Sequence, residues 1–270
     1  MYNDLFSIGK ITIHSYGVLI ALGYVTAILI CYFRAKKRDL DPEVILDIAL
    51  IAIFGGLGGG KLLYIIVEWK RFIEKPLALL GGDGFVVYGG IIVAAVCAVI
   101  YCKIRKADFL TYFDLVMPAV SVAQAIGRLG CFFAGCCYGA PTESPIGVIF
   151  PSGSLAPAGI RLWPTQLFSS GGDLIIAAIL FAVSTRKTKK GTVGSLYLVL
   201  YGIGRFIVEF FRADSRGTVG QLSTSQFISI FIFAIGAILL IYFNFLSNKD
   251  KDGNKEGKSG KDKKRKEAAK

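Results

Sequence analysis

Seven long apolar blocks, separated by shorter polar segments, constrain this chain more than any other feature of its sequence. A helix needs roughly 20 mostly apolar residues to cross the hydrocarbon core of a membrane. The blocks that reach about this length are 14–33, 46–67, 84–102, 112–133, 165–183, 193–211 and 226–246. Hydrophobic residues make up 54% of the chain. The sequence therefore predicts an all-α, polytopic membrane protein with about seven transmembrane helices.

The N-terminal residues do not have the pattern of a cleavable signal peptide. Residues 1–13 lack the basic start, the short apolar stretch and the small-residue cleavage site of such a segment. Block 14–33 is long enough to span the membrane, so we expect it to remain in the mature protein.

The distribution of Lys and Arg between the two sets of loops predicts the orientation. Of the 31 Lys and Arg residues, 21 lie after the first, third and fifth blocks or in the C-terminal tail, and seven lie on the other side. Because cytoplasmic loops are enriched in Lys and Arg, we expect the N-terminus outside and the C-terminus in the cytoplasm. The net charge of +12 then reflects topology and the tail, and we expect no nucleic-acid partner.

The C-terminal tail differs in composition from the rest of the chain. Residues 247–270 are rich in Lys and almost free of large apolar side chains, which is typical of disorder. We therefore expect a transmembrane domain over residues 1–246 and a disordered basic cytoplasmic tail over 247–270. A solvated topology anchor is the simpler interpretation of this tail, although basic segments are attracted to anionic lipid.

The six cysteines do not indicate a disulfide framework, because none lies in a long extracellular loop. Cys131, Cys136 and Cys137 are close together in the sequence. However, their spacing matches no zinc pattern, and the only histidine, His14, is far away in the chain. We therefore expect no metal site and no cofactor, and interpret these residues as small apolar side chains.

Three cations lie inside the predicted spans: Lys61, Arg128 and Arg205. Such a residue costs at least about 2.5–3.5 kcal/mol near the middle of a span, so it needs a partner or a wet cavity. At the helical rise per residue, all three lie about 18–24 Å from the inner ends of their spans, in the outer half of the membrane. On the sixth span, Arg205, Glu209 and Arg212 share one helical face.

This common depth favours a cationic cavity open toward the outer leaflet. Guanidinium groups bind phosphate oxygens bidentately, so the expected ligand is an anionic lipid headgroup. Tyr16 and Tyr88, near the outer ends of the first and third blocks, fall at a similar level. The alternative remains that Arg205 and Glu209 form an ion pair that serves helix packing alone, and that Arg128 snorkels to the interface.

Glycines cluster beside two of these residues. Five glycines among residues 55–60 precede Lys61, and Gly89 and Gly90 follow Tyr88. Small residues in membrane helices usually permit close helix approach. They also loosen a helix, so that its backbone groups can face a headgroup cavity.

Residues 127–139 read GRLGCFFAGCCYG. This stretch resembles the signature of the bacterial prolipoprotein diacylglyceryl transferase family, G-R-x-G-N-F-x-N-G-x-x-x-G. Other matches occur in the same order: Tyr16-Gly17, Asp114, Pro118, the block PTQLF at 164–168, and Tyr201, Gly202, Arg205, Phe206, Glu209, Phe210 and Arg212. The resemblance covers residues from about 9 to 246 and agrees with seven spans and an outside N-terminus.

Three departures from the family pattern leave a divergent branch or a paralogue open. The family's His-Gly-Gly is Tyr88-Gly89-Gly90 here. The two signature asparagines are Cys131 and Ala134. The family's G-x-R in the second span appears as residues 59–61, with Lys61 in place of arginine.

The resemblance implies a multi-pass enzyme of the bacterial cell membrane that needs no cofactor. The family transfers the diacylglyceryl group of phosphatidylglycerol to the lipobox cysteine thiol of a preprolipoprotein, which forms a thioether and releases glycerol phosphate. The implied catalytic residues are Arg128, Arg205, Tyr88 and Glu209. The implied substrate-binding residues are Arg128, Tyr16, Lys61, Gly89, Gly90, Gln166 and Arg212.

The roles that follow place Arg128 and Arg205 at the phosphate and the leaving group, with Glu209 orienting Arg205. Tyrosine, with a pKa near 10, is a poor base, so we expect Tyr88 to donate a hydrogen bond. His14 lies near the same level and is a candidate to replace the missing family histidine, although an ordinary interfacial residue is the simpler interpretation. Nearby cations also favour the thiolate of the substrate.

Two other functions use the same cationic cavity. One is a membrane protein that binds or transports anionic lipid without catalysis. Transporters often contain internal repeats with paired broken helices, and we find no convincing repeat in the sequence. The other is a paralogue that transfers a lipid group to a different acceptor. Turnover of phosphatidylglycerol with a lipobox peptide separates these possibilities.

Overall fold

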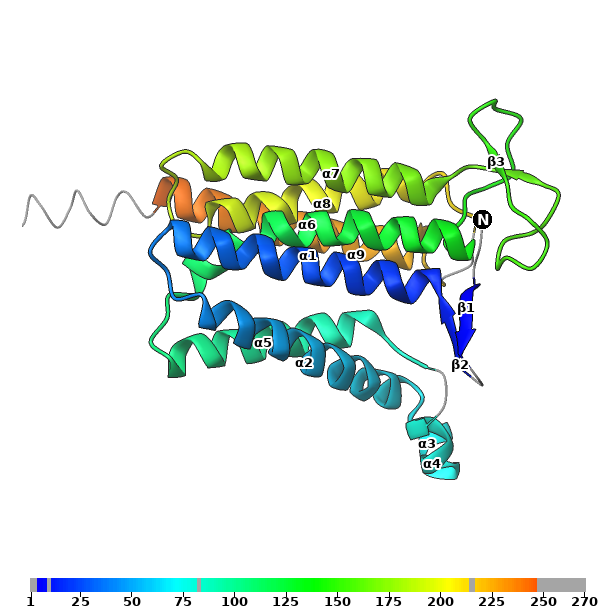
Figure 1. Cartoon of the computed structure of the whole chain (residues 1–270), viewed down its shortest axis with the longest axis horizontal. Coiled ribbons are helices and arrows are strands. Elements are labelled where there is room, and N and C mark those ends of the chain that lie inside the picture. The colour runs from blue at the N-terminus through cyan, green and yellow to red at the C-terminus, as the bar shows by residue number, and fades with distance from the viewer. Residues whose placement is uncertain (1–3, 9–10, 82–83, 214–216, 247–270) are drawn as a thin grey trace, which may run out of the picture. The chain divides into compact units, whose positions relative to one another are not determined.

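The computed structural model describes residues 4–8, 11–81, 84–213 and 217–246. Within these residues, seven helices are long and apolar enough to cross a membrane. They are α1 (Ser15–Lys37), α2 (Glu43–Val67), α5 (Val87–Ile104), α6 (Phe109–Ala134), α7 (Thr165–Ser184), α8 (Thr192–Glu209) and α9 (Thr224–Ile241), which continues as the π-helix η1 (Tyr242–Leu246) (Figure 1). Each overlaps one predicted block, so the prediction of a helical protein with seven membrane-spanning helices is confirmed.

The helix ends differ from the predicted ends by a few residues. At α1 the helix continues past its predicted end to Lys37, and so includes Arg34 and Lys36 in its last turn. These cations were expected in the following loop. They interact favourably with the partial negative charge at a helix C-terminus, which allows the helix to extend beyond its apolar residues.

The all-α expectation was incomplete, because the described part of the chain contains three short antiparallel hairpins that connect or precede the helices. They are β1 (Asp4–Ile8) with β2 (Ile11–His14), β3 (Val148–Ile149) with β4 (Arg161–Leu162), and β5 (Thr218–Val219) with β6 (Leu222–Ser223). Pairing satisfies backbone groups that a loop would otherwise leave open. Two short helices, α3 (Trp69–Glu74) and α4 (Pro76–Gly81), also lie between α2 and α5.

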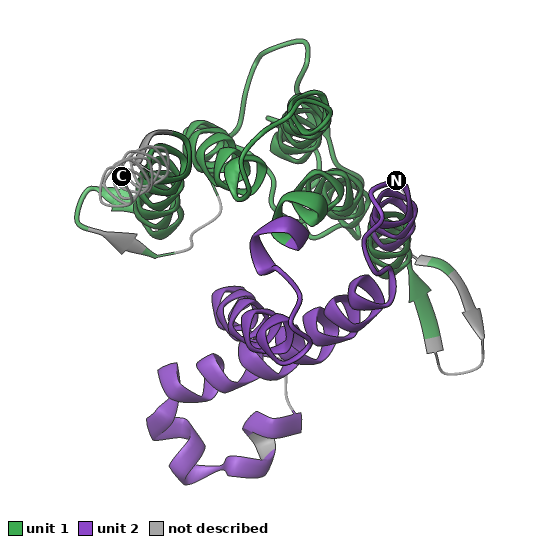
Figure 2. Ribbon diagram, turned by 90° about the vertical axis from the view of Figure 1, so that its left-hand side faces the viewer, with its two compact units in different colours: residues 1–27, 113–270 green, residues 28–112 purple. Residues whose placement is uncertain are grey.

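The chain divides into two compact units (Figure 2). Unit 1 comprises residues 1–27 and 113–270, and unit 2 comprises residues 28–112. The predicted domain boundary at residue 247 stays a prediction, because residues 247–270 lie outside the described part of the chain.

In unit 1, a buried carboxylate of α6 positions the start of α8. Asp114 accepts hydrogen bonds from the backbone N–H groups of Gly191 and Gly194, each at 2.7 Å. The first N–H groups of a helix have no partner within the helix and carry partial positive charge. Asp114 therefore replaces the local cap that Gly191 cannot provide, and it ties α6 to α8.

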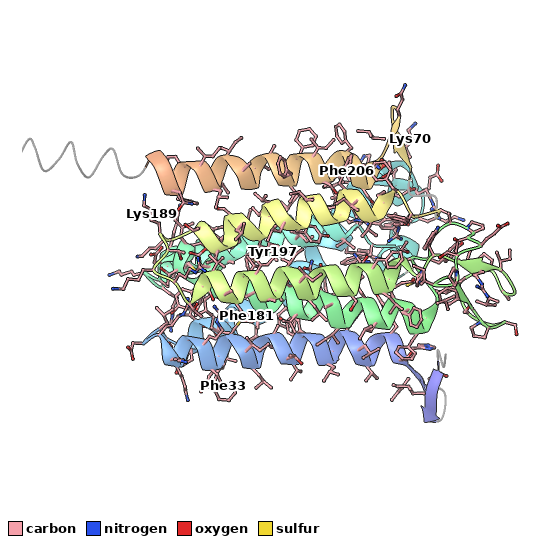
Figure 3. All side chains as sticks on the ribbon, turned by 90° about the horizontal axis from the view of Figure 1, so that it is seen from above. Phe33, Lys70, Phe181, Lys189, Tyr197 and Phe206 are labelled. Atoms are coloured by element: carbon pink, nitrogen blue, oxygen red, sulfur yellow. The ribbon has the colours of Figure 1, made fainter. Side chains whose placement is uncertain are left out.

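Small residues and a compact apolar cluster hold the other helices of unit 1 together. A Cβ on Gly23 of α1 would lie 2.9 Å from the carbonyl oxygen of Ala123 in α6, so the two helices approach closely. Ile176 and Leu180 of α7 pack with Tyr197 of α8. Figure 3 shows Tyr197 part-way along the helices, between Lys189 toward one end and Phe206 toward the other.

Unit 2 is built around the pair α2 and α5. A Cβ on Gly59 would lie 2.6 Å from the carbonyl oxygen of Gly89, and a Cβ on Gly90 would overlap the carbonyl oxygen of Gly56. The two backbones are therefore in direct contact along a seam of glycines. This is the close approach that small residues permit between membrane helices.

Candidate functional site

A small cavity in unit 1 brings together charged residues from three helices. It has a volume of about 40 Å³, and its lining includes Arg128 of α6, Asp173 of α7 and Arg205 of α8. Asp173 interacts electrostatically with both arginines. The two cations singled out in the fourth and sixth blocks therefore meet at one place, although 77 positions separate them in the sequence.

Arg205 is held by partners on two sides. Its Nη2 lies 2.9 Å from Oε2 of Glu209, one turn further along α8, and the two side chains are only 9% and 6% exposed. The same nitrogen donates a hydrogen bond to Oγ of Ser225 at 2.8 Å. Nη1 of Arg205 is buried and has no hydrogen-bond partner among the described residues. A buried charged donor without a partner is costly, so this nitrogen is available to an anionic ligand.

The N-terminus of α9 supplies the hydroxyl groups around this ion pair. Ser223 is the N-cap of α9 and forms a capping box with Gln226, which fixes the position of the first turn. The hydroxyl of Ser223 also donates to Oε1 of Glu209 at 2.9 Å. The helix cap and the charged pair therefore stabilise each other.

Arg212 extends the charged network beyond the end of α8. Its Nε lies 3.9 Å from Oε2 of Glu209, and its side chain is 3% exposed. Its backbone pairs with Gly139, at the end of the signature stretch. Three guanidinium groups, on Arg128, Arg205 and Arg212, thus face two carboxylates, and the site keeps an excess of positive charge.

Gln166 anchors the loop that follows α6. Its side chain is fully buried at the start of α7, and its Nε2 donates to the carbonyl oxygen of Cys136 at 2.8 Å. Its Oε1 has no hydrogen-bond partner within the described part of the chain. The predicted substrate-binding role of Gln166 stays a prediction, while its contact with Cys136 is a positioning role.

Tyr16 lies in the first turn of α1 and is 41% exposed. A Cβ on Gly130 would come within 3.3 Å of its carbonyl oxygen, so α1 packs directly on the signature stretch. The phenol of Tyr16 also interacts electrostatically with Arg128 and Cys131. His14 precedes it at the end of β2 and is exposed.

The remaining predicted residues belong to unit 2. Nζ of Lys61 donates to the carbonyl oxygen of Gly84 at 3.5 Å and lies 5.6 Å from the ring centre of Tyr64. Gly89 and Gly90 pack against the α2 backbone, which is a structural role. Tyr88 lies in the first turn of α5 and is half-buried. The predicted roles of these residues toward substrate stay predictions.

Asp173 and Ser225 were not among the residues predicted from the sequence. Asp173 is an ionisable residue inside the fifth block, and the rule that singled out the cations would have found it. Ser225 carries no such signal, because a serine in the first turn of a helix is ordinary. Only the packing of α9 against α8 brings its hydroxyl to Arg205.

Comparisons with known proteins agree with these observations. A family model described as prolipoprotein diacylglyceryl transferase matches residues 3–242. Similar curated proteins are named phosphatidylglycerol–prolipoprotein diacylglyceryl transferase. The relative from Clostridium tetani is 49% identical over 86% of this chain and 94% of its own length. A second relative, numbered 2, from Clostridium perfringens is 46% identical over 90% of this chain and 95% of its own length. A third, from Finegoldia magna, is 36% identical over 88% of this chain and 94% of its own length.

The resemblance seen in the signature stretch is thereby confirmed over most of the chain. The departures at Tyr88, Cys131 and Ala134 do not exclude this chain from the family, because the family model matches the sequence through all seven spans. The chain is a multi-pass membrane protein that belongs to the prolipoprotein diacylglyceryl transferase family.

Proposed function

We propose that this chain transfers the diacylglyceryl group of phosphatidylglycerol to the lipobox cysteine thiol of preprolipoproteins, and that the cavity beside Arg128 and Arg205 binds the phosphate. The names of the similar proteins describe this reaction. The observation that most supports the phosphate site is the buried Nη1 of Arg205, which has no hydrogen-bond partner among the described residues. A phosphate oxygen is a ligand of the right charge and size for it.

The charge that develops during the reaction explains why arginines are needed. The thiol sulfur attacks the glycerol carbon that bears the phosphate, a carbon–sulfur bond forms, and the carbon–oxygen bond breaks. The bonding electrons leave with glycerol phosphate, so negative charge grows on the phosphate oxygen. Preorganised cations at that oxygen stabilise the transition state. Glu209, Ser223 and Ser225 hold the guanidinium of Arg205 in place before the lipid arrives.

The cavity, at about 40 Å³, has room for little more than a phosphate group. The glycerol and the acyl chains of the lipid therefore lie outside it. The guanidinium groups favour the thiolate, and the thiol proton passes to bulk water as the cysteine approaches them. Tyr88 is assigned a hydrogen bond to the substrate rather than proton abstraction.

We also propose that this site faces the outer leaflet. Arg186, Lys187, Lys189 and Lys190 lie at or between the ends of α7 and α8, and cytoplasmic loops collect such cations. Arg205 lies near the opposite end of α8. A reporter that is active only in the periplasm should be inactive when fused after Lys270 and active when fused before Met1. The reverse result would show that the orientation is inverted.

The decisive experiment uses the purified full chain with phosphatidylglycerol and a peptide that contains a lipobox cysteine. The expected products are a diacylglyceryl peptide and glycerol phosphate, with a peptide carrying Ser in place of Cys as the control. A folded sample that binds phosphatidylglycerol without turnover would support the non-catalytic alternative. Release of glycerol phosphate without modification of the lipobox peptide would support a paralogue with another acceptor.

A further inference from the structure

Three thiols meet at the C-terminal end of α6. The Sγ atoms of Cys131, Cys136 and Cys137 all lie within 4.8 Å of one another. Their sequence spacing predicted no metal site, because it matches no zinc pattern. That expectation took no account of the backbone between them, which turns back on the helix.

The turn has the geometry of a Schellman motif. Gly135 has a φ of +74°, and its N–H donates to the carbonyl oxygen of Phe132 at 3.2 Å. The N–H of Cys136 donates to the carbonyl oxygen of Cys131 at 3.1 Å. This pair of bonds is the usual way to end a helix with a left-handed residue. It folds Cys136 back over the last turn of α6, beside Cys131.

Two buried side chains of α7 fix the position of the next peptide units. Gln166 donates to the carbonyl oxygen of Cys136 at 2.8 Å, and Oγ1 of Thr165 donates to that of Cys137 at 2.7 Å. Both side chains are fully buried. Cys137 itself has a φ of +63°, a conformation that costs about 1–3 kcal/mol in a residue other than glycine. The cluster is thus held by the fold and does not depend on a flexible loop.

Arg212 places positive charge beside the cluster, because its guanidinium interacts directly with the side chain of Cys137. Metal ligands must lose their protons before they bind. A neighbouring cation offsets part of the negative charge that three thiolates bring to one place.

We propose that Cys131, Cys136 and Cys137 form a binding site for a thiophilic d10 metal ion, Zn²⁺ or Cu⁺, held by three thiolates. Bonds of about 2.3 Å from zinc to sulfur place the sulfurs roughly 3.8 Å apart, so a small contraction of the cluster suffices. Three S–H groups release three protons and three sulfur–metal bonds form, with no change of oxidation state. With Zn²⁺ the three thiolates give the site one negative charge, which Arg212 offsets.

The test measures metal binding to the reduced full chain in detergent. Zn²⁺ and, under anaerobic conditions, Cu⁺ are titrated separately against a competing chelator, and the tighter of the two identifies the preferred ion. One ion should bind per chain. Cys131→Ser and Cys137→Ser should each weaken binding at least about 100-fold, because losing a ligand costs more than losing a hydrogen-bond partner of a ligand. The matched control replaces the other three cysteines, Cys31, Cys97 and Cys102, with serine, and should bind as tightly as the unmodified protein.

A second measurement needs no substitution and so does not depend on the variants folding. Bound ion should slow the alkylation of Cys136 and Cys137 by a maleimide, read peptide by peptide by mass spectrometry, while Cys97 reacts at an unchanged rate. The proposal is overturned if the reduced chain binds neither ion saturably. It is also overturned if the triple control loses the ion, or if alkylation of the cluster is the same with and without metal.

Discussion

The two units give the cations of their predicted spans different surroundings. Unit 1 buries a network in which Arg205, Glu209 and Arg212 are paired through side chains. Unit 2 joins α2 to α5 through glycines, and Lys61 donates to a backbone carbonyl. A cation within a predicted span can therefore serve either ligand binding or local structure. In unit 1, carboxylates and hydroxyls preorganise Arg205 for an anion, whereas in unit 2 Lys61 contacts a backbone carbonyl and an aromatic ring.

The largest expected effect tests whether unit 1 holds the phosphate. Arg128→Ala should lower kcat/KM for transfer by about 100-fold to 1,000-fold, because one preorganised charge at the transition state is lost. Arg128→Lys should also be poor, since it keeps the charge and loses the bidentate fork. The transfer rate per folded enzyme is measured with phosphatidylglycerol and a lipobox peptide. Near-normal rates for Arg128→Ala would remove this residue from the site.

A second prediction separates catalysis from packing in the same network. Replacing Arg205 by Met together with Glu209 by Leu removes both partners of a buried pair, which is often neutral for stability. Because Glu209 also lies beside Arg212 and accepts a hydrogen bond from Ser223, we expect the double variant to be somewhat less stable than the unmodified protein but more stable than Glu209→Leu alone. Transfer should fall by about 100-fold or more. Glu209→Leu alone is the control and should unfold earlier, because it leaves Arg205 without its ion-pair partner. Retained activity in the double variant would mean that the pair serves packing alone.

The close contact between α2 and α5 predicts that a larger side chain at Gly90 lowers the stability of unit 2. Gly90→Ala places a Cβ against the backbone of Gly56, and such overpacking costs about 1–3 kcal/mol. Gly58 also lies in α2, and a Cβ added to it would have no atom within 4 Å. Gly58→Ala is therefore the matched control. Thermal unfolding in detergent should show a lower midpoint for Gly90→Ala only. Equal midpoints would mean that the two helices separate at little cost.

A smaller effect is expected at Asp173, whose carboxylate opposes the two arginines of the cavity. Asp173→Asn removes one negative charge beside the proposed phosphate and should lower KM for phosphatidylglycerol by about 3-fold to 10-fold, given the strength of partly screened charges. The exposed Glu143, changed to Gln, controls for net charge. A raised KM in Asp173→Asn would indicate that the carboxylate contacts the substrate directly.

The smallest effect tests whether unit 2 contributes to chemistry at all. If the hydroxyl of Tyr88 donates a hydrogen bond to substrate, Tyr88→Phe should lower kcat by roughly 5-fold, in line with one hydrogen bond. Tyr88→His restores the family residue and should be tolerated. An unchanged rate for Tyr88→Phe would leave the phenol without a role, and an inactive but folded Tyr88→His would show that this position has diverged.

The sequence by itself determined the seven spans, because the thickness of the hydrocarbon core requires about 20 apolar residues per helix and few other folds contain such blocks. It also singled out Arg128 and Arg205, because a charge inside a span is rare and costly. The family pattern followed from short motifs whose residues and order are readable along the chain.

Only the tertiary structure decided which partners these residues have. Asp173 and Ser225 reach the arginines, and Ser223 reaches Glu209, because α7 and α9 pack against α8. Such contacts between distant segments leave no local periodicity in the sequence. The same holds for Cys131, Cys136 and Cys137, which meet because Gly135 reverses the chain. The number of residues between two side chains predicts their distance in space only while the backbone keeps one regular geometry. A left-handed residue at the end of a helix changes the direction of the backbone, so the prediction fails there.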